Sequence, residues 1–284
     1  MKLASYSVSG EATWGTIENE QAVNIGAVLG KQYPDLKSVI AAGAYAAIES
    51  ALASAPRNPL SSITWLPVIP NPSKILCVGL NYENHRVETG RAVVGFPTIF
   101  TRFPNTQIGH LANIVRPRNS TDLDYEGELA LIIGKAGRHI ARETVFDHIA
   151  GYACYNDASI RDFQYHTPQF TPGKNFPGTG SFGPWMATPD ELGELGSLRI
   201  STTLNAQVVQ DAELGQMIFD IPAIVSYCSS FNPLEPGDVI VTGTPGGVGA
   251  RRTPPLWMKA GDVVEVAIER LGVLRNTVVD EAGR

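Results

Sequence analysis

One segment constrains the fold more than any other: DLDYEGELALIIGK, residues 122–135, joins a row of carboxylates to a continuous apolar run. The carboxylates belong to Asp122, Asp124, Glu126 and Glu128. Side chains of a β-strand alternate between its two faces, so these four acidic groups are predicted to point the same way. The run that follows, residues 129–133, has no polar residue and indicates a strand buried on both faces.

The acidic row has two explanations. Half-buried strands commonly turn polar side chains toward solvent, and the row then forms an exposed face. Alternatively, the last carboxylates lie at the edge of the core, where like charges are costly unless a cation lies between them. The segment alone favours neither an exposed face nor a metal site.

Composition restricts the class of protein and of partner. With 284 residues, 43% hydrophobic and 18% charged, the chain is long enough for one large globular domain and a smaller appendage. A net charge of −6 argues against nucleic acid or an anionic membrane as the main partner, whereas a small anionic substrate fits. No apolar run approaches the roughly 20 residues of a membrane span, and no signal-peptide pattern opens the sequence, so we expect a cytoplasmic protein. Cys77, Cys154 and Cys228 are predicted to be reduced core residues.

Two domains are predicted. Residues 1–65 form a small N-terminal α/β domain, with short strand patterns and an alanine-rich helical stretch at 36–55. The proline-rich residues 56–74 indicate a linker into the main domain, which spans 66–284. There, β-branched runs are separated by glycine and proline turns without βαβ alternation, so we predict a β-rich α+β fold with an antiparallel or mixed sheet. The runs cover residues 74–80, 122–134, 197–210, 238–243 and 262–279.

Two glycine-rich segments lack the context of a nucleotide-binding loop. GTGSFG, residues 178–183, has the spacing of a dinucleotide fingerprint, but it runs into Pro184 and opens no helix. GTPGGVG, residues 243–249, lacks the Lys and Ser/Thr of a phosphate-binding loop. The backbone N–H groups of this second segment can still bind a carboxylate or an oxyanion.

His85 and Glu88, in the segment GLNYENHRVETG, are three residues apart and share a face if the segment is helical. A carboxylate bonded to an imidazole fixes its tautomer and raises its basicity, which is the arrangement of a general base. An exposed His beside an exposed Glu is the simpler alternative. Gly79 and Gly90 flank the segment and are consistent with a mobile loop.

A third carboxylate, Asp157, follows the apolar run IAGYACY. Glu126 and Glu128 likewise lie at one end of an apolar run, residues 129–133. Together the three make a plausible oxygen site for Mg²⁺, Mn²⁺ or Ca²⁺. The absence of a CxxC pair argues against zinc.

Further polar residues follow Asp157. Arg161 and Gln164 belong to a dense polar cluster, and His166, close to Gln164, is a weaker candidate for substrate contact. Lys174 lies between Pro172-Gly173 and a glycine-rich loop, where an ordinary surface lysine is the alternative to a functional one.

In this order, the motifs resemble the fumarylacetoacetate hydrolase family. The matching segments are ILCVGLNYENH, YEGELALIIGK, YNDASIRDFQ, the GK at Lys174, LEPGDVIVTGTPGGVG and GVLRNTVV, which cover the chain from about residue 70 onward. The resemblance implies a mixed β-sandwich roll of the family's C-terminal-domain type. It also implies a homodimer and a divalent cation, Mg²⁺ or Mn²⁺, with Ca²⁺ as a further option.

The resemblance assigns roles to individual residues. Glu126, Glu128 and Asp157 are similar to the metal ligands. His85 with Glu88 is similar to the water-activating pair, and Lys174 to the group that meets the substrate's oxygen. The implied substrate-binding residues are Arg161, Gln164 and Thr244.

The activity implied by the resemblance is hydrolysis of a carbon–carbon bond in a 2,4-dioxo acid of the acylpyruvate type, with the metal as electron sink for the departing enolate. Aromatic catabolism is the implied setting. The alternative is a decarboxylase, hydratase or isomerase of the oxaloacetate or hydroxymuconate type at the same site. A metal-dependent binding protein without activity is disfavoured because His85, Glu88 and Lys174 are all present. Arg102, in TRFPN, stands where many relatives have Lys, and NFPGTGSFGPW also departs from the family pattern.

Overall fold

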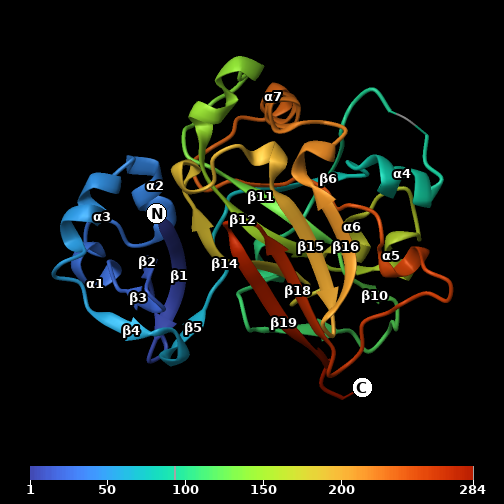
Figure 1. Ribbon diagram of the computed structural model, residues 1–284, viewed down its shortest axis with the longest axis horizontal. Coiled ribbons are helices and arrows are strands. Elements are labelled where there is room, and N and C mark those ends of the chain that lie inside the picture. Colours follow the sequence, from blue (N-terminus) through green and yellow to red (C-terminus); the bar gives the residue numbers. More distant parts are fainter. Residues whose placement is uncertain (93, 284) are drawn as a thin grey trace.

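A large mixed sheet forms the centre of the molecule in the computed structural model, which describes residues 1–92 and 94–283 (Figure 1). In spatial order its path runs through β4 (Arg57–Pro59), β3 (Gln21–Val23), β2 (Glu11–Glu18), β1 (Lys2–Val8), β14 (Gly180–Ala187), β12 (Ile149–Asp157), β11 (Gly127–Ile133), β17 (Val239–Val241), β6 (Ile75–Gly79) and β7 (Thr98–Thr101). At its margins, β5 (Ile63–Trp65) pairs with β1, and β8 (Gln107–Ile108) pairs with β14. The pair β17 and β6 is parallel and the pair β11 and β12 antiparallel, so the predicted mixed, β-rich α+β class is confirmed.

A second sheet packs on the first. It contains β16 (Gln207–Glu213), β15 (Arg199–Leu204), β18 (Val263–Ile268), β19 (Gly272–Asp280) and β9 (Asn113–Arg116). Figure 1 shows its orange and red strands in front of the green β11 and β12. A separate ribbon pairs β10 (Leu123–Asp124) with β13 (Ser159–Ile160).

The strand β11 is buried on both faces, as its apolar sequence predicts. Leu129, Leu131 and Ile133 join a core cluster that includes residues of β15 and β18 in the second sheet. On the other face, Ala130 and Ile132 join a cluster with residues of the N-terminal strands and helices. The site described below is built at the Gly127 end of this strand, so it is held by two packed layers.

In the part of the chain that the structure describes, seven short helices and several 3-10 turns surround the sheets. The helices are α1 (Gly26–Leu29), α2 (Leu36–Ala42), α3 (Tyr45–Ala51), α4 (Glu83–Thr89), α5 (Arg161–Gln164), α6 (Thr171–Lys174) and α7 (Ile221–Phe231). The 3-10 turns are Leu60–Ser62, Pro104–Thr106, Arg142–His148, Pro189–Glu191, Leu195–Ser197, Leu214–Gln216 and Gly249–Arg251. Within residues 1–92 and 94–283, no helix is both long and apolar enough to cross a bilayer.

The single helical stretch predicted for residues 36–55 is wrong, because it forms the two helices α2 and α3. Gly43 separates them with a φ of +59°, a left-handed conformation that ends α2 and that glycine adopts without a steric cost. The first helix begins at an Asp35 cap, whose carboxylate accepts a hydrogen bond from the Ser38 backbone N–H.

The linker predicted at residues 56–74 is also wrong in its first half. Residues 57–59 and 63–65 form β4 and β5, which pair with β3 and β1. In addition, β1 pairs with β14, so the N-terminal strands extend the same sheet that carries β11. The sequence missed this because strand pairing depends on partners far along the chain. The domain boundary at residue 65 stays a prediction.

Three of the predicted strand runs are divided. The run at 197–210 is the hairpin β15–β16, which turns at Asn205 and Ala206 with φ values of 51° and 64°. The run at 262–279 is the hairpin β18–β19. The run at 122–134 breaks after β10, because β10 pairs with β13 and β11 pairs with β12 and β17. The three cysteines are free and buried, as predicted.

His110 links the N-terminal part of the chain to the second sheet, and it makes folding sensitive to pH. Its ring lies edge-on to Trp65, with 5.3 Å between centroids, and its Nδ1 accepts a hydrogen bond from the Arg275 backbone N–H. Burial, assisted by the Arg275 charge, lowers the pKa of His110 to about 4. The unfolded chain therefore takes up a proton at higher pH than the folded chain does, and stability falls as the pH falls from about 6.5 toward 4.

The substitution His110→Asn should weaken this dependence, because the Asn side-chain oxygen can accept the Arg275 hydrogen bond without titrating. Between pH 7.5 and pH 5, the wild type should lose about 1 to 2 kcal/mol more free energy of unfolding than the variant. Urea unfolding at the two pH values measures the difference. Equal losses in both proteins would contradict the assignment.

Candidate active site

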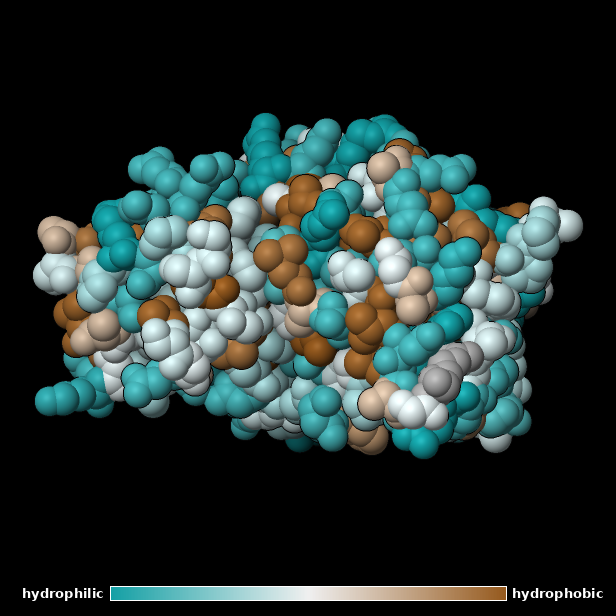
Figure 2. All heavy atoms as spheres, turned by 90° about the horizontal axis from the view of Figure 1, so that it is seen from below, coloured by the Kyte–Doolittle hydropathy of each residue, from teal (hydrophilic) through white to brown (hydrophobic). Residues whose placement is uncertain are grey.

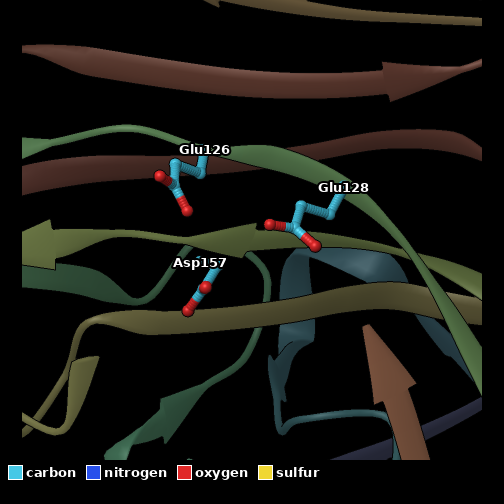
Figure 3. Close-up of side chains that lie close together, drawn as sticks. All are labelled: Glu126, Glu128 and Asp157. Atoms are coloured by element: carbon cyan, nitrogen blue, oxygen red, sulfur yellow. The ribbon is translucent and has the colours of Figure 1, made fainter. Parts of the chain in front are cut away.

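Three carboxylates converge where β11 begins and β12 ends (Figure 3). The two strands are antiparallel and pair Gly127 with Asn156, so Glu126 and Asp157 lie side by side. One oxygen from each of Glu126, Glu128 and Asp157 lies within 4.8 Å of the others, and all three residues are buried. An ion with oxygen ligands at about 2.1 to 2.4 Å places those oxygens no more than about 4.8 Å apart, so the donor set fits Mg²⁺ or Mn²⁺.

The acidic row predicted along residues 122–128 is wrong for its first two members. Asp122 is only partly buried and lies outside the group of converging carboxylates. Asp124 is fully buried but belongs to the separate β10–β13 ribbon, where it bonds to the Arg161 guanidinium Nε at 2.8 Å. The break between β10 and β11 ends the strict alternation on which the prediction rested.

Three buried cations surround the carboxylates. Lys174 Nζ lies 2.5 Å from a Glu126 carboxylate oxygen and 2.6 Å from an Asp157 oxygen. The second oxygen of Glu126 lies 2.7 Å from Arg161 Nη2. Arg102 Nη1 lies 2.5 Å from the second oxygen of Asp157, and its Nη2 donates to the Thr179 hydroxyl. Lys174 is therefore not the surface lysine that its sequence context also allowed.

The cluster has one more acidic group than it has cations. Its members are Asp124, Glu126, Glu128 and Asp157 against Arg102, Arg161 and Lys174. Burial acts to raise the pKa of Glu126, but the Arg161 and Lys174 charges outweigh it and lower that pKa to about 2. Glu128 accepts only the Gly243 backbone N–H in the described part of the chain. Burial and the charges of Asp157 and Glu126 hold the pKa of Glu128 well above its usual range. A cation at the oxygens of Glu128 would offset this unpaired charge.

The structure brings His85 and Glu88 together on one face of α4. His85 Nδ1 lies 2.7 Å from one Glu88 oxygen, and the other Glu88 oxygen accepts the Gly247 backbone N–H at 2.9 Å. His85 is buried, whereas Glu88 is partly exposed. The exposed His–Glu pair that the sequence also allowed is therefore ruled out for His85.

Residues 243–250, here called the glycine loop, bind carboxylates through the backbone, as the sequence suggested. The carboxylates are the protein's own. Gly243 donates to Glu128, Gly247 donates to Glu88, and Gly249 with Ala250 donates to the two oxygens of Asp124. The loop is thereby bonded to both the carboxylate cluster and the His85–Glu88 pair.

A single pocket brings most of the predicted site residues together. Its polar wall is formed by His85, Glu126, Glu128, Arg161, Gln164, Lys174 and Thr244. Its apolar wall is formed by Val78, Leu80, Phe100, Phe170 and Val248, and the remaining lining residues are Gly79, Thr89, Arg91, Tyr165 and Arg251. Glu88 and Asp157 do not line the pocket and lie one contact behind it, where they bond to His85 and Lys174.

The predicted substrate-binding residues differ in whether their polar atoms already have hydrogen-bond partners within the protein. Gln164 accepts a hydrogen bond from Arg161 through its oxygen, and its Nε2 has no partner among the described residues. The Thr244 hydroxyl already donates to the Gly127 carbonyl and accepts from Gln210. His166 is exposed, packs against the Phe163 ring at 4.8 Å and does not line the pocket.

Sequence reasoning missed two members of the cluster. Arg102 was noted only as a departure from the family pattern, yet it bonds to Asp157, which lies 55 residues away. Asp124 was placed in a row with Glu126, yet it fastens the glycine loop to Arg161. The Asp-x-Glu-x-Glu spacing marked Asp124 for attention, whereas nothing local to TRFPN reveals the partner of Arg102.

Comparison with known proteins places this geometry in a family. The family model described as fumarylacetoacetate (FAA) hydrolase C-terminal matches residues 74–279. A rat protein named oxaloacetate tautomerase Fahd2a, mitochondrial, is 39% identical over 228 residues, which are 80% of this chain and 73% of the rat protein.

Two solved structures share the whole fold. The fumarylacetoacetate hydrolase of Exiguobacterium antarcticum is 34% identical, with a TM-score of 0.88 over 99% of this chain and 100% of that one. The maleylpyruvate hydrolase of Sphingobium sp. SYK-6, in complex with manganese(II) ion and pyruvate, is 28% identical, with a TM-score of 0.83 over 99% of each chain. On the matched segment and these relatives, the chain belongs to the fumarylacetoacetate hydrolase family.

Proposed function

We propose that this protein is a divalent-metal-dependent enzyme that moves a proton at C3 of a small 2-oxo acid and so interconverts its keto and enol forms. The observation that carries the proposal is the His85–Glu88 pair, whose imidazole lines a pocket that also contains Glu126, Glu128 and a buried lysine. An imidazole, a carboxylate set and a cation in one pocket are the groups that enolisation of a 2-oxo acid requires.

Glu126, Glu128 and Asp157 would hold the metal. Their converging oxygens and the unpaired charge of Glu128 support Mg²⁺ or Mn²⁺, and the manganese in the maleylpyruvate hydrolase structure agrees with this choice. When bound, the ion supplies a Lewis acid that polarises the 2-oxo group and the neighbouring carboxylate.

His85 is the proposed proton carrier. When its Nδ1 donates to Glu88, its Nε2 is the basic nitrogen and can take the proton from C3 of the substrate. The electron pair of the C3–H bond then forms the enolate, whose oxygen receives a proton to complete the tautomer. Glu88 stabilises the imidazolium that forms in between, and the Gly247 N–H keeps Glu88 in place.

Lys174 acts as a fixed positive charge in this proposal. Burial acts to lower its pKa, but the charges of Asp157 and Glu126 outweigh burial and raise it above its usual value. The ion pairs with Glu126 and Asp157 therefore favour the protonated ammonium. It stabilises negative charge that develops on the substrate, and the apolar wall of the pocket strengthens that effect by excluding water.

Keto–enol tautomerisation of an oxaloacetate-like acid is our first candidate, because the tautomerase relative is 39% identical over most of this chain. Hydrolysis of a 2,4-dioxo acid is the second candidate, supported by the likeness to maleylpyruvate hydrolase. In hydrolysis, His85 takes its proton from water, the water oxygen attacks C4, and the C3–C4 bond breaks. The products are a carboxylic acid and a pyruvate enolate, which then takes a proton at C3.

Two isotope experiments separate these candidates. Tautomerisation exchanges the C3 hydrogens of a 2-oxo acid for deuterium in D₂O without breaking the carbon chain, which proton NMR detects. Hydrolysis of an acylpyruvate in H₂¹⁸O puts label in the released carboxylic acid. Loss of CO₂ from oxaloacetate without either signature would favour a decarboxylase instead.

The setting of this activity is also a proposal. We infer a small anionic 2-oxo acid as the only partner besides the metal and a second copy of the chain, with no nucleic acid or membrane partner. The cytoplasmic location and a role in aromatic catabolism stay predictions, since the rat relative is described as mitochondrial.

The metal site can be tested by the substitution Glu128→Gln. The variant keeps the side-chain volume but removes the carboxylate that lacks a cationic partner, so its affinity for Mn²⁺ should fall at least about tenfold. Titration calorimetry with MnCl₂ measures the affinity. Glu143→Gln, at an exposed site, is the control and should bind like the wild type. Equal affinities in wild type and Glu128→Gln would refute the assignment.

The role of His85 can be tested by the substitution His85→Asn. The rate of C3 hydrogen exchange should fall by about 10² to 10⁴, the usual cost of removing a general base, while Mn²⁺ affinity is retained. Glu88→Gln should lower the rate less, because the imidazole remains. His139→Asn is a suitable control, since His139 is exposed and has a φ of 55°, which Asn tolerates. Unchanged exchange in His85→Asn would exclude this residue as the base.

The oligomeric state gives a further prediction. Figure 2 shows apolar side chains gathered between hydrophilic ones across the middle of one face, as expected for a surface covered by another subunit. Light scattering at micromolar concentration should return twice the chain mass of 30.5 kDa. A mass of 30.5 kDa would show that the homodimer proposal is wrong.

A further inference from the structure

Gln210 is a buried polar residue beside the active site that the proposed chemistry does not use. It lies on β16, at the edge of the second sheet, with 2% of its surface exposed, and it does not line the pocket. Its strand contains a β-bulge at Val209, which has no partner in the register between β15 and β16. A bulge interrupts the alternation of a strand and redirects its side chains. Val209 and Gln210 are therefore both buried although they are consecutive.

The first residue of β11 has no strand partner on one edge. The ladder between β11 and β17 ends at Val241, and the next residue, Thr242, still donates its N–H to the Leu129 carbonyl. Backbone groups of residues two apart face the same edge of a strand, so those of Gly127 face the point where the chain leaves the sheet. Buried N–H and C=O groups without partners are costly, so side chains have to replace the missing strand here.

Gln210 and Thr244 provide these partners and form a closed ring of hydrogen bonds with Gly127. The Gln210 Oε1 accepts the Gly127 N–H at 3.0 Å, and its Nε2 donates to the Thr244 hydroxyl at 2.7 Å. That hydroxyl donates to the Gly127 carbonyl at 3.0 Å. The second N–H of the Gln210 amide donates to the Pro245 carbonyl at 2.8 Å. These partners fix the orientation of the amide, because a reversed amide would place an N–H group against the Gly127 N–H.

Two of the carboxylates in the cluster are held in different ways. Both oxygens of Glu126 are bonded to buried cations, Lys174 and Arg161. Glu128 has no cationic partner in the described part of the chain, and its carboxylate accepts only the Gly243 backbone N–H. The position of the Glu128 carboxylate therefore depends on the distance between its own backbone and that of Gly243.

Gln210 bonds on both sides of this contact. It bonds to Gly127, which precedes Glu128, and to Thr244, which follows Gly243. We propose that Gln210 is a positioning residue of the active site, which holds the Glu128 carboxylate where the metal ion would be bound. The inference rests on the proposed function, because it takes Glu128 as a metal ligand.

The test uses the substitution Gln210→Met, which keeps the length of the side chain but removes all three hydrogen bonds. Titration of the metal-free protein with MnCl₂ by calorimetry should show an affinity about tenfold lower than that of the wild type. C3 hydrogen exchange of oxaloacetate should be slower at low MnCl₂ and should recover as the MnCl₂ concentration is raised. In His85→Asn, by contrast, added MnCl₂ should not restore the exchange.

Gln207→Met is the matched control, because Gln207 lies on the same strand but is exposed. It should bind Mn²⁺ like the wild type. A residue that only stabilises the fold would give a different result: Gln210→Met would unfold at lower urea concentration, yet the folded protein would bind Mn²⁺ with unchanged affinity. That outcome would overturn the proposal.

The ring can also be broken at its other corner. Thr244→Val removes the hydroxyl but keeps the side-chain shape, and it should bind Mn²⁺ more weakly than Thr244→Ser, which keeps the hydroxyl. If both residues act through one ring, the double variant Gln210→Met with Thr244→Val should bind no more than about twofold more weakly than the weaker single variant. Losses that multiply would contradict a shared ring. If Gln210→Met does not fold, the Thr244 variants decide, and equal affinities in the two would overturn the proposal.

The two proposals fail in distinguishable ways. If Glu128→Gln weakens Mn²⁺ binding and Gln210→Met does not, only the positioning role is refuted. If Glu128→Gln binds Mn²⁺ like the wild type, the metal assignment is refuted, and the positioning role with it. If Gln210→Met weakens Mn²⁺ binding but the wild type exchanges no C3 hydrogen, the proposed activity is refuted and the positioning role stands.

Discussion

Everything around the pocket depends on the pairing of buried charges at the junction of β11 and β12. Lys174 bridges Glu126 and Asp157, Arg161 bridges Glu126 and Asp124, and every member of this set is buried. Removing one partner of a buried ion pair costs about 3 to 5 kcal/mol, because the remaining charge is left uncompensated in a medium of low dielectric constant. The cluster is therefore better understood as a device that fixes geometry than as a source of stability.

The glycine loop connects the carboxylate cluster to the His85–Glu88 pair. Its backbone N–H groups bond to Glu128 at one end, to Glu88 in the middle and to Asp124 at the other end. A loop of side-chain donors would lose rotamer entropy on ordering, whereas backbone donors are already fixed by the fold. The His85–Glu88 pair and the carboxylate set are thus bonded to the same loop, although they come from a helix and strands that are far apart in the sequence.

Much of the site could be predicted from the sequence, and the reason is local. Glu128 lies in β11 and Glu126 directly precedes that strand, while His85 and Glu88 lie three apart in one helix, so the members of each pair meet through local geometry. Arg102 and Asp124 were missed because their partners are brought close only by the fold. The same distinction holds for the architecture: the burial of β11 follows from its own residues, whereas the division of residues 36–55 into two helices depends on the backbone conformation of Gly43.

The pairing of β1 with β14 has a consequence for how the chain acquires its structure. Lys2 pairs with Ala187, so residues about 180 positions apart must come together. The chain loses the entropy of closing this long loop before the contact between the strands can stabilise it. During synthesis, the strands β1 to β3 leave the ribosome early and can form their own meander, but the edge of β1 that belongs to β14 stays open meanwhile. Another chain can add a strand to an open edge of this kind. We therefore expect the partly folded chain to be most prone to aggregation in that interval, when a low concentration of chains or a chaperone would protect it.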